Sequence, residues 1–110
     1  MKTLLAIALS ICALVTVGRA GEIPVEEAKN HIGETTTVKG VVEQVTKGPK
    51  SVFLNFGGRY PDQTFTVVSF NLPFSALSSF EGKTISVTGM ISSNNGKPGM
   101  TVNNLTQLVK

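Results

Sequence analysis

The chain has 110 residues, with ten Lys and Arg against seven Asp and Glu. Two of the basic residues, Lys2 and Arg19, lie in an apolar leader, and without them eight basic residues stand against seven acidic ones, a net charge of +1. A charge this small does not by itself indicate a polyanionic partner, so that case depends on where the charges lie. The single cysteine, Cys12, is also in the leader, which excludes a disulfide and a thiolate metal site from the rest of the chain.

Residues 1–20 predict a secretory signal peptide. Lys2 supplies a positive start, Leu4 to Val17 is an almost unbroken apolar run, and small residues stand at the −3 and −1 positions of a cleavage site before Gly21. An uncleaved membrane helix is less favoured, because a span needs about 20 apolar residues. A lipoprotein site is also less favoured, since isoleucine rather than Gly or Ala precedes Cys12. We therefore expect residues 21–110 to form one secreted or periplasmic domain.

The first elements predicted after the leader are a short helix and a long strand. The helix runs from Pro24 to His31, with acidic residues in its first turn, and Gly33 is placed to end it. Glu34 to Thr46 has the β-branched residues of a strand. Gly40 in its middle would weaken a flat strand, so we expect a bulge or sharp coil there. A turn follows from Lys47 to Lys50.

The segment from Ser51 to Phe70 predicts two strands joined by a glycine-rich loop. Val52, Leu54 and Phe56 alternate with other residues, as in a half-buried strand, and Thr64 to Phe70 is rich in β-branched and aromatic residues. We expect this hairpin to supply much of the core and any flat binding face, because it contains five of the seven aromatic residues: Phe53, Phe56, Tyr60, Phe65 and Phe70.

The rest of the chain predicts one more helix and two or three more strands. Leu72 to Phe80 reads as a two-turn helix with Phe74 and Leu77 on one apolar side. Lys83 to Ser92 is a strand, and Asn94-Asn95-Gly96 is a tight hairpin signal whose loop we expect to extend to Gly99. The segments Met100–Asn103 and Leu105–Val109 close the chain as one interrupted strand or two short ones.

Two segments share the pattern G-x-T-x-x-V-x-G-x-[VI]. They are Gly33 to Val42 and Gly82 to Ile91, and each follows a predicted helix. The repeat suits two equivalent strands that bend around a closed sheet, with Gly40 and Gly89 absorbing the curl. Five short strands with such glycines, and one internal helix after the third, predict an all-β barrel rather than a sandwich.

From Ile32 to Lys110, these elements resemble an OB-fold domain of the nucleic-acid-binding type. The resemblance rests on the strand order, the coiled first strand, the helix Pro73–Phe80 and the segment Gly82–Gly89. It extends to small exported bacterial proteins that consist of one such domain and carry segments like Phe53–Gly58 and Gly96–Pro98. It implies a five-stranded antiparallel barrel with a helix between strands three and four and a short leading helix. It also implies a ligand face on the second and third strands.

The sequence offers no set of residues for catalysis. The one histidine, His31, ends the leading helix, and the spacing of a zinc site is missing. The carboxylates after the leader are scattered: Glu22, Glu26, Glu27, Glu34, Glu43, Asp62 and Glu81. We therefore expect a protein that is not an enzyme and that uses no cofactor or metal.

A binding module is the better interpretation, and two partner classes stay open. The first is single-stranded DNA or RNA, or another oligoanion, held by loop cations and exposed aromatic rings. Phe53 could form such a surface with either Phe65 or Phe70, but not with both, because those two lie on opposite strand faces. The second is a periplasmic protein or glycan, to which Asn55, Thr64 and Thr66 could present hydrogen bonds. The candidate ligand-binding residues are Lys47, Lys50, Phe53, Asn55, Arg59, Tyr60 and Lys97.

Overall fold

A computed structural model describes residues 22–94 and 96–110 of the protein. The predicted signal peptide and its cleavage before Gly21 lie outside these residues and stay predictions. Within the described ranges, no helix is both long enough and apolar enough to span a membrane.

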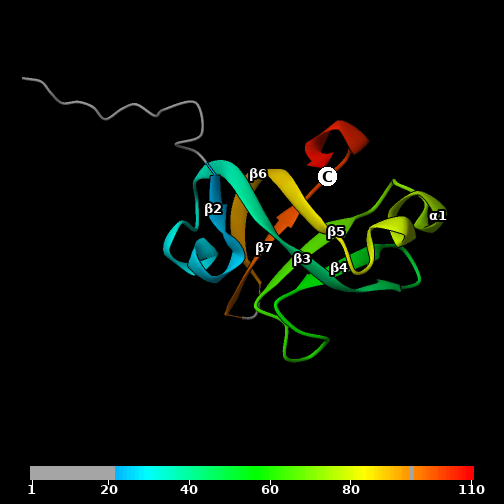
Figure 1. The fold of residues 1–110 in the computed structure, drawn as a ribbon, viewed down its shortest axis with the longest axis horizontal. Helices are drawn as coiled ribbons and strands as arrows, with labels where there is room; N and C mark the ends of the chain where they lie inside the picture. Colours follow the sequence, from blue (N-terminus) through cyan, green and yellow to red (C-terminus); the bar gives the residue numbers. More distant parts are fainter. Residues whose placement is uncertain (1–21, 95) are drawn as a thin grey trace, which may run out of the picture.

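The centre of the structure is a closed barrel of five strands (Figure 1). Each barrel strand pairs with the next in the order β3-β4-β5-β7-β6, and β6 returns to pair with β3. The β5–β7 pair is parallel and the other four pairs are antiparallel. This confirms the all-β barrel expected from the sequence. The strands are β3 (Thr35–Lys47), β4 (Val52–Phe56), β5 (Phe65–Ser69), β6 (Thr84–Asn94) and β7 (Lys97–Thr101).

Short helices and edge strands surround the barrel. The internal helix lies between the third and fourth barrel strands, as expected, and consists of α1 (Phe74–Leu77) followed by the 3-10 turn η4 (Ser78–Phe80). The leading helix is a 3-10 helix, η3 (Val25–Asn30), and a further 3-10 turn, η5 (Leu105–Gln107), precedes the end of the chain. Two short strands extend the sheet: β2 (Glu22–Pro24), parallel to β3, and β8 (Leu108–Val109), antiparallel to β6.

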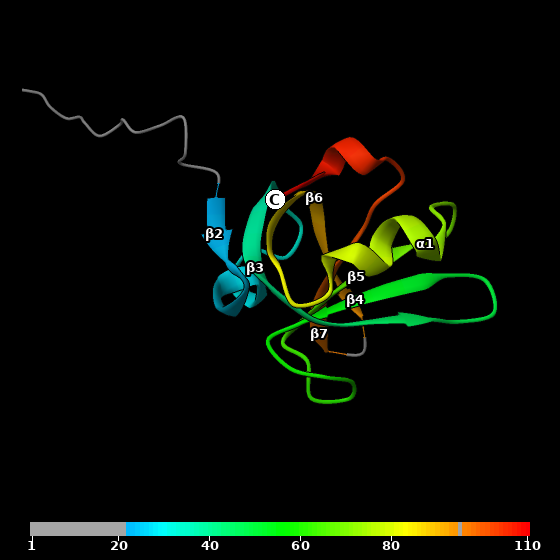
Figure 2. The ribbon, with the colours of Figure 1, turned by 45° about the vertical axis from the view of Figure 1, so that its right-hand side comes forward.

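The core lies inside the barrel and follows strand alternation. Leu54, Phe56, Phe65 and Val67 are fully buried, and the rings of Phe56 and Phe65 pack edge to face with centroids 5.7 Å apart. The helical segment lies beside β4 and β5 (Figure 2) and adds Leu77 and Phe80 to the core. Phe74, expected on the same apolar side, is instead 37% exposed.

The β7 strand corrects the expected hairpin loop. Lys97, Pro98 and Gly99 belong to the strand rather than to the loop, and they pair with β6. Pairing with β5 starts only at Gly99. Pro98 therefore lies where β7 has a neighbour on one side only, a position at which a missing N–H is tolerated.

The two copies of the repeated pattern pair with each other. Val38 of β3 stands opposite Val87 of β6, the equivalent residue of the other copy, so the antiparallel pair has a local two-fold symmetry. The hydrogen bonds repeat as well: Gly33 N donates to Ile91 O, Gly82 N donates to Val42 O, and both distances are 2.7 Å. Both Gly33 and Gly82 have positive φ, +93° and +84°, which explains a glycine at each position.

Gly40 permits a close contact rather than a bulge. The register shift of β3 against β4 falls between Val42 and Gln44, not at Gly40. A Cβ atom at Gly40 would lie 2.6 Å from Val25 Cγ1 and 3.3 Å from Phe56 Cδ2. The expected bulge at Gly40 is therefore wrong, and the glycine is needed because η3 packs directly on β3.

We expect Gly40→Ala to lower the free energy of unfolding by about 1–3 kcal/mol, because the added methyl group overpacks the contact with the stiff Val25 side chain. Urea unfolding provides the measurement. Gly89→Ala is the matched control, since its Cβ would meet the side chain of Met100 at 3.0 Å, and a methionine can move away. Two results would contradict the role of Gly40 in the contact with Val25. One is an equal loss of stability in Gly40→Ala and Gly89→Ala. The other is strict additivity of the stability losses of Gly40→Ala and Val25→Ala, because additive effects mean that the two residues do not interact.

Candidate functional site

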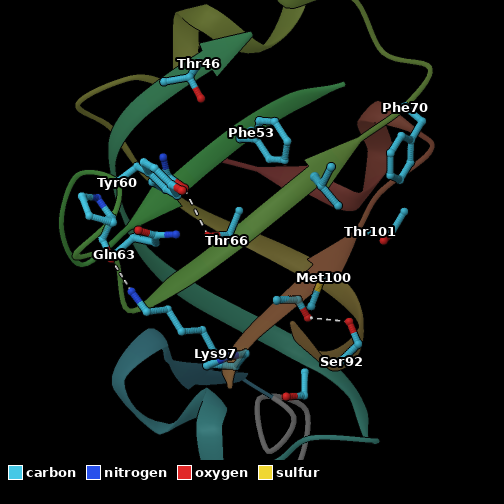
Figure 3. A pocket seen from close by; sticks show the side chains of 16 residues that line it. Thr46, Phe53, Tyr60, Gln63, Thr66, Phe70, Ser92, Lys97, Met100 and Thr101 are labelled. Atoms are coloured by element: carbon cyan, nitrogen blue, oxygen red, sulfur yellow. Dashed lines mark hydrogen bonds between the residues drawn. The ribbon is translucent and has the colours of Figure 1, made fainter. Parts of the chain in front are cut away.

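A groove of about 810 Å³ runs over the outer face of β4, β5 and β7 (Figure 3). Strand alternation creates it, because the residues between the core positions point outward: Phe53 and Asn55 from β4, Thr66 and Val68 from β5, and Gly99 and Thr101 from β7. The loop between β4 and β5 forms one side. The groove thus lies on the second and third barrel strands, where the OB-fold resemblance implies a ligand face.

Three aromatic side chains line the groove. Tyr60 is 71% exposed and Phe70 is 64% exposed, whereas Phe53 is half-buried. Phe65 is fully buried in the core, so of the two alternatives left open by the sequence it is Phe70 that shares the groove with Phe53. Large apolar rings left in water are typical of binding surfaces.

The register shift in β3 brings a further residue to this face. Before the shift, Val38 and Val42 point into the barrel; after it, Val45 does, so Gln44 and Thr46 turn outward. Gln44 Oε1 accepts hydrogen bonds from Asn55 Nδ2 at 3.0 Å and from Tyr60 N at 2.8 Å. Gln44 could not be predicted as part of this face from the sequence, because no local signal marks the shift.

Asn55 lies in the floor of the groove, but its side chain is engaged in the fold. It is 2% exposed, and besides donating to Gln44 it accepts a hydrogen bond from Thr66 Oγ1 at 3.1 Å. A buried amide with both of its ends paired is a structural element. The arrangement of Thr66, Asn55 and Gln44 therefore ties the two central strands to the backbone of Tyr60.

The β4–β5 loop is fixed in several further places. Gly57 and Gly58 have φ values of +76° and +152°, and a Cβ at Gly57 would lie 2.5 Å from Thr64 Oγ1. The Tyr60–Pro61 peptide bond is cis. Lys97 Nζ donates a hydrogen bond to Pro61 O, which connects the loop to β7. Tyr60 is thus held beside the groove by backbone contacts at its own position and at its neighbour.

The predicted cations divide between three places. Lys97 lines the groove, whereas Lys47 and Lys50 line a second hollow next to it. Arg59 lies off both, and its Nη1 atom donates to Glu43 O at 3.3 Å. Of the seven predicted site residues, the groove therefore brings together Phe53, Asn55, Tyr60 and Lys97. Their role in binding a ligand stays a prediction.

Charge is unevenly distributed around the groove. Within residues 22–94 and 96–110, no acidic side chain lines the groove or the second hollow, but three lysines do. The protein after the leader has nearly equal numbers of basic and acidic residues. This surface is therefore locally positive because the acidic residues lie elsewhere, not because the protein is basic as a whole. The same described residues contain no cluster of three His, Cys, Asp or Glu side chains that could hold a metal ion.

We expect Gln44→Ala to lower the free energy of unfolding by about 1–3 kcal/mol, because it leaves the buried Asn55 amide without its acceptor. It should also speed hydrogen exchange at Tyr60 N. Gln44→Glu is the matched control, since a carboxylate oxygen can accept both hydrogen bonds and should restore most of the stability. Unchanged stability and unchanged exchange in Gln44→Ala, measured by urea unfolding and NMR, would contradict this assignment.

Comparison with known proteins supports the fold alone. No protein-family model matches the sequence, and no curated protein matches it. A solved structure described as an aspartyl-tRNA synthetase from Leishmania major Friedlin superposes with a TM-score of 0.57 at 13% identity, over 88% of this chain and 22% of that one. OBody AM1L10 bound to hen egg-white lysozyme gives a TM-score of 0.46 at 15% identity, over 64% of this chain and 78% of that one, which is too low to support a conclusion. This chain spans about a fifth of the synthetase, and its barrel is OB-fold-like.

Proposed function

We propose that this protein binds single-stranded DNA or RNA, or a chemically similar oligoanion, along the groove and does not catalyse a reaction. The observation that supports this most is the combination of exposed rings and segregated charge: Tyr60 and Phe70 border a groove in which the described residues include no carboxylate. Proteins that bind single strands with little sequence preference use this combination of stacking surfaces and cations.

The remaining polar groups of the groove suit a nucleobase. Hydroxyl groups of Thr46, Ser92 and Thr101 lie along the same groove and can bond to bases without strong discrimination.

A protein or glycan partner is the second hypothesis, and the structure gives it less support. Two of the side chains that could have presented hydrogen bonds to it, Asn55 and Thr66, are bonded to each other, and Asn55 also bonds Gln44. The third, Thr64, packs under Gly57. We further propose that the protein acts outside the cytoplasm, on the basis of the sequence of residues 1–20.

We expect Tyr60→Ala and Phe70→Ala each to weaken binding of a labelled single-stranded oligonucleotide by about 5- to 150-fold, the loss that corresponds to one stacked base at about 1–3 kcal/mol. Fluorescence anisotropy measures it. Met90→Ala is the matched control, because Met90 is 57% exposed on β6 and lies off the groove. An equal loss in Met90→Ala, or no loss in the two ring variants, would rule out stacking in the groove.

The salt dependence should be shallow for a nucleic-acid-binding protein. Three lysines line the groove and the second hollow, and each phosphate neutralised on a single strand contributes about −0.7 to the slope of log K against log salt. We therefore expect a slope of about −0.7 if the strand contacts only Lys97 of the groove, and of about −2 if it also contacts the two lysines of the second hollow. No binding at low salt, or a slope of zero, would exclude phosphate recognition, and a slope steeper than about −4 would place the phosphates on other lysines.

A further inference from the structure

The second hollow adjoins the groove at Phe70. It has a volume of about 610 Å³ and lies between the turn that joins β3 to β4 and the connection from β5 to α1. Phe70 lines both the groove and the second hollow, so its exposed ring forms the border between them. A ligand that stacks on Phe70 is therefore already at the edge of the second hollow.

The second hollow contains two cations that the fold leaves available. Among the described residues, the side chains of Lys47 and Lys50 make neither an ion pair nor a hydrogen bond. Lys97 and Arg59 differ in this respect, because each donates to a backbone carbonyl. Two exposed ammonium groups in a hollow whose described lining includes no carboxylate would attract an anion.

The second hollow also offers an aromatic surface. Phe74 at the start of α1 lines it and is 37% exposed, although its spacing with Leu77 predicted burial. Together with Phe70, which also lines the groove, it gives the second hollow two aromatic rings. A single strand needs a repeated pairing of rings and cations of this kind.

Both walls of the second hollow are held by hydrogen bonds. Gly48 N donates to Ser51 O at 2.7 Å and closes the β3–β4 turn between the two lysines. On the other side, Ser69 Oγ accepts from Leu72 N at 3.0 Å, and Asn71 Nδ2 donates to Asn103 O at 2.9 Å. The second hollow is thus formed before a ligand arrives, which reduces the ordering cost of binding.

We propose that a bound single strand continues from the groove over Phe70 into the second hollow, where Lys47 and Lys50 contact its phosphates and Phe74 stacks on one of its bases. This inference rests on the proposed function and gives it a direction. The strand passes from the Lys97 end of the groove to the β3–β4 turn. It also gives the site a length, because a strand that fills only the groove leaves Lys47, Lys50 and Phe74 without a contact.

The experiment compares oligodeoxythymidines of about four and about ten nucleotides, within the range of site sizes of one OB fold. A longer strand binds more tightly simply because it can occupy the site in more positions. Beyond that statistical factor, we expect the longer strand to bind at least about tenfold more tightly. Its salt slope should be steeper by about −1.4, because two further phosphates are neutralised. The double variant Lys47→Ala/Lys50→Ala should remove the steeper slope, and Phe74→Ala should reduce the gain in affinity. Neither should change binding of the shorter strand.

Lys29→Ala/Lys39→Ala is the matched control, because it removes the same charge from exposed lysines that line neither the groove nor the second hollow. An equal effect of the control variant on the longer strand would overturn the inference. The inference would also be overturned if the two strands had equal salt slopes and, after correction for the number of binding positions, equal affinities. If one of these two results is found while the shorter strand still binds and depends on Tyr60, the inference alone is overturned and the proposed function stands. If neither strand binds, the proposed function fails with it.

Discussion

The register shift in β3 between Val42 and Gln44 determines which side chains form the core and which form the groove. One additional residue in a strand shifts the alternation, so that every side chain after it lies on the opposite face of the sheet. Val45 therefore fills the barrel, and Gln44 and Thr46 reach the outside. Without the shift the barrel would have to bury an amide and a hydroxyl group in place of valine, at the cost of unpaired polar groups.

The polar contacts on the outer face then make the groove rigid. Gln44 connects Asn55 to the backbone of Tyr60, and Lys97 bonds the next residue of the same loop. Because hydrogen bonds fix the backbone at Tyr60 and at Pro61, the Tyr60 ring can remain exposed to water instead of packing onto the sheet. The backbone of Tyr60 is thus connected through Gln44 to the buried amide of Asn55. A binding surface formed in advance loses less freedom when a ligand arrives.

Much of the fold could be predicted from the sequence, because the signals were local and periodic. The alternation from Val52 to Phe56 and the turn glycines at Gly33 and Gly82 each correspond to an element of the barrel. The register shift could not be predicted, since the glycine that suggested it, Gly40, serves a contact with Val25 instead. β2 was missed because three residues are too few to show a period.

The site could be predicted only in part. Candidate residues that do line the groove include Phe53, Tyr60 and Lys97. They could be predicted because strand alternation and the positions of the loops indicate which side chains lie on the outer face. Sequence alone could not separate free cations from engaged ones. Arg59 and Lys50 lie in neighbouring loops, but a carbonyl of β3 accepts a hydrogen bond from Arg59, and that contact exists only in the folded barrel.

The ends of the described chain lie on another part of the barrel. Val109 of β8 stands opposite Ser86, and the hydroxyl of Ser86 donates to Glu22 Oε2 at 2.8 Å. Both ends thus emerge beside the β3–β6 pair, whereas the groove lies over β4, β5 and β7 (Figure 2). A dye, a surface tether or a fused domain attached at either end would leave the groove open.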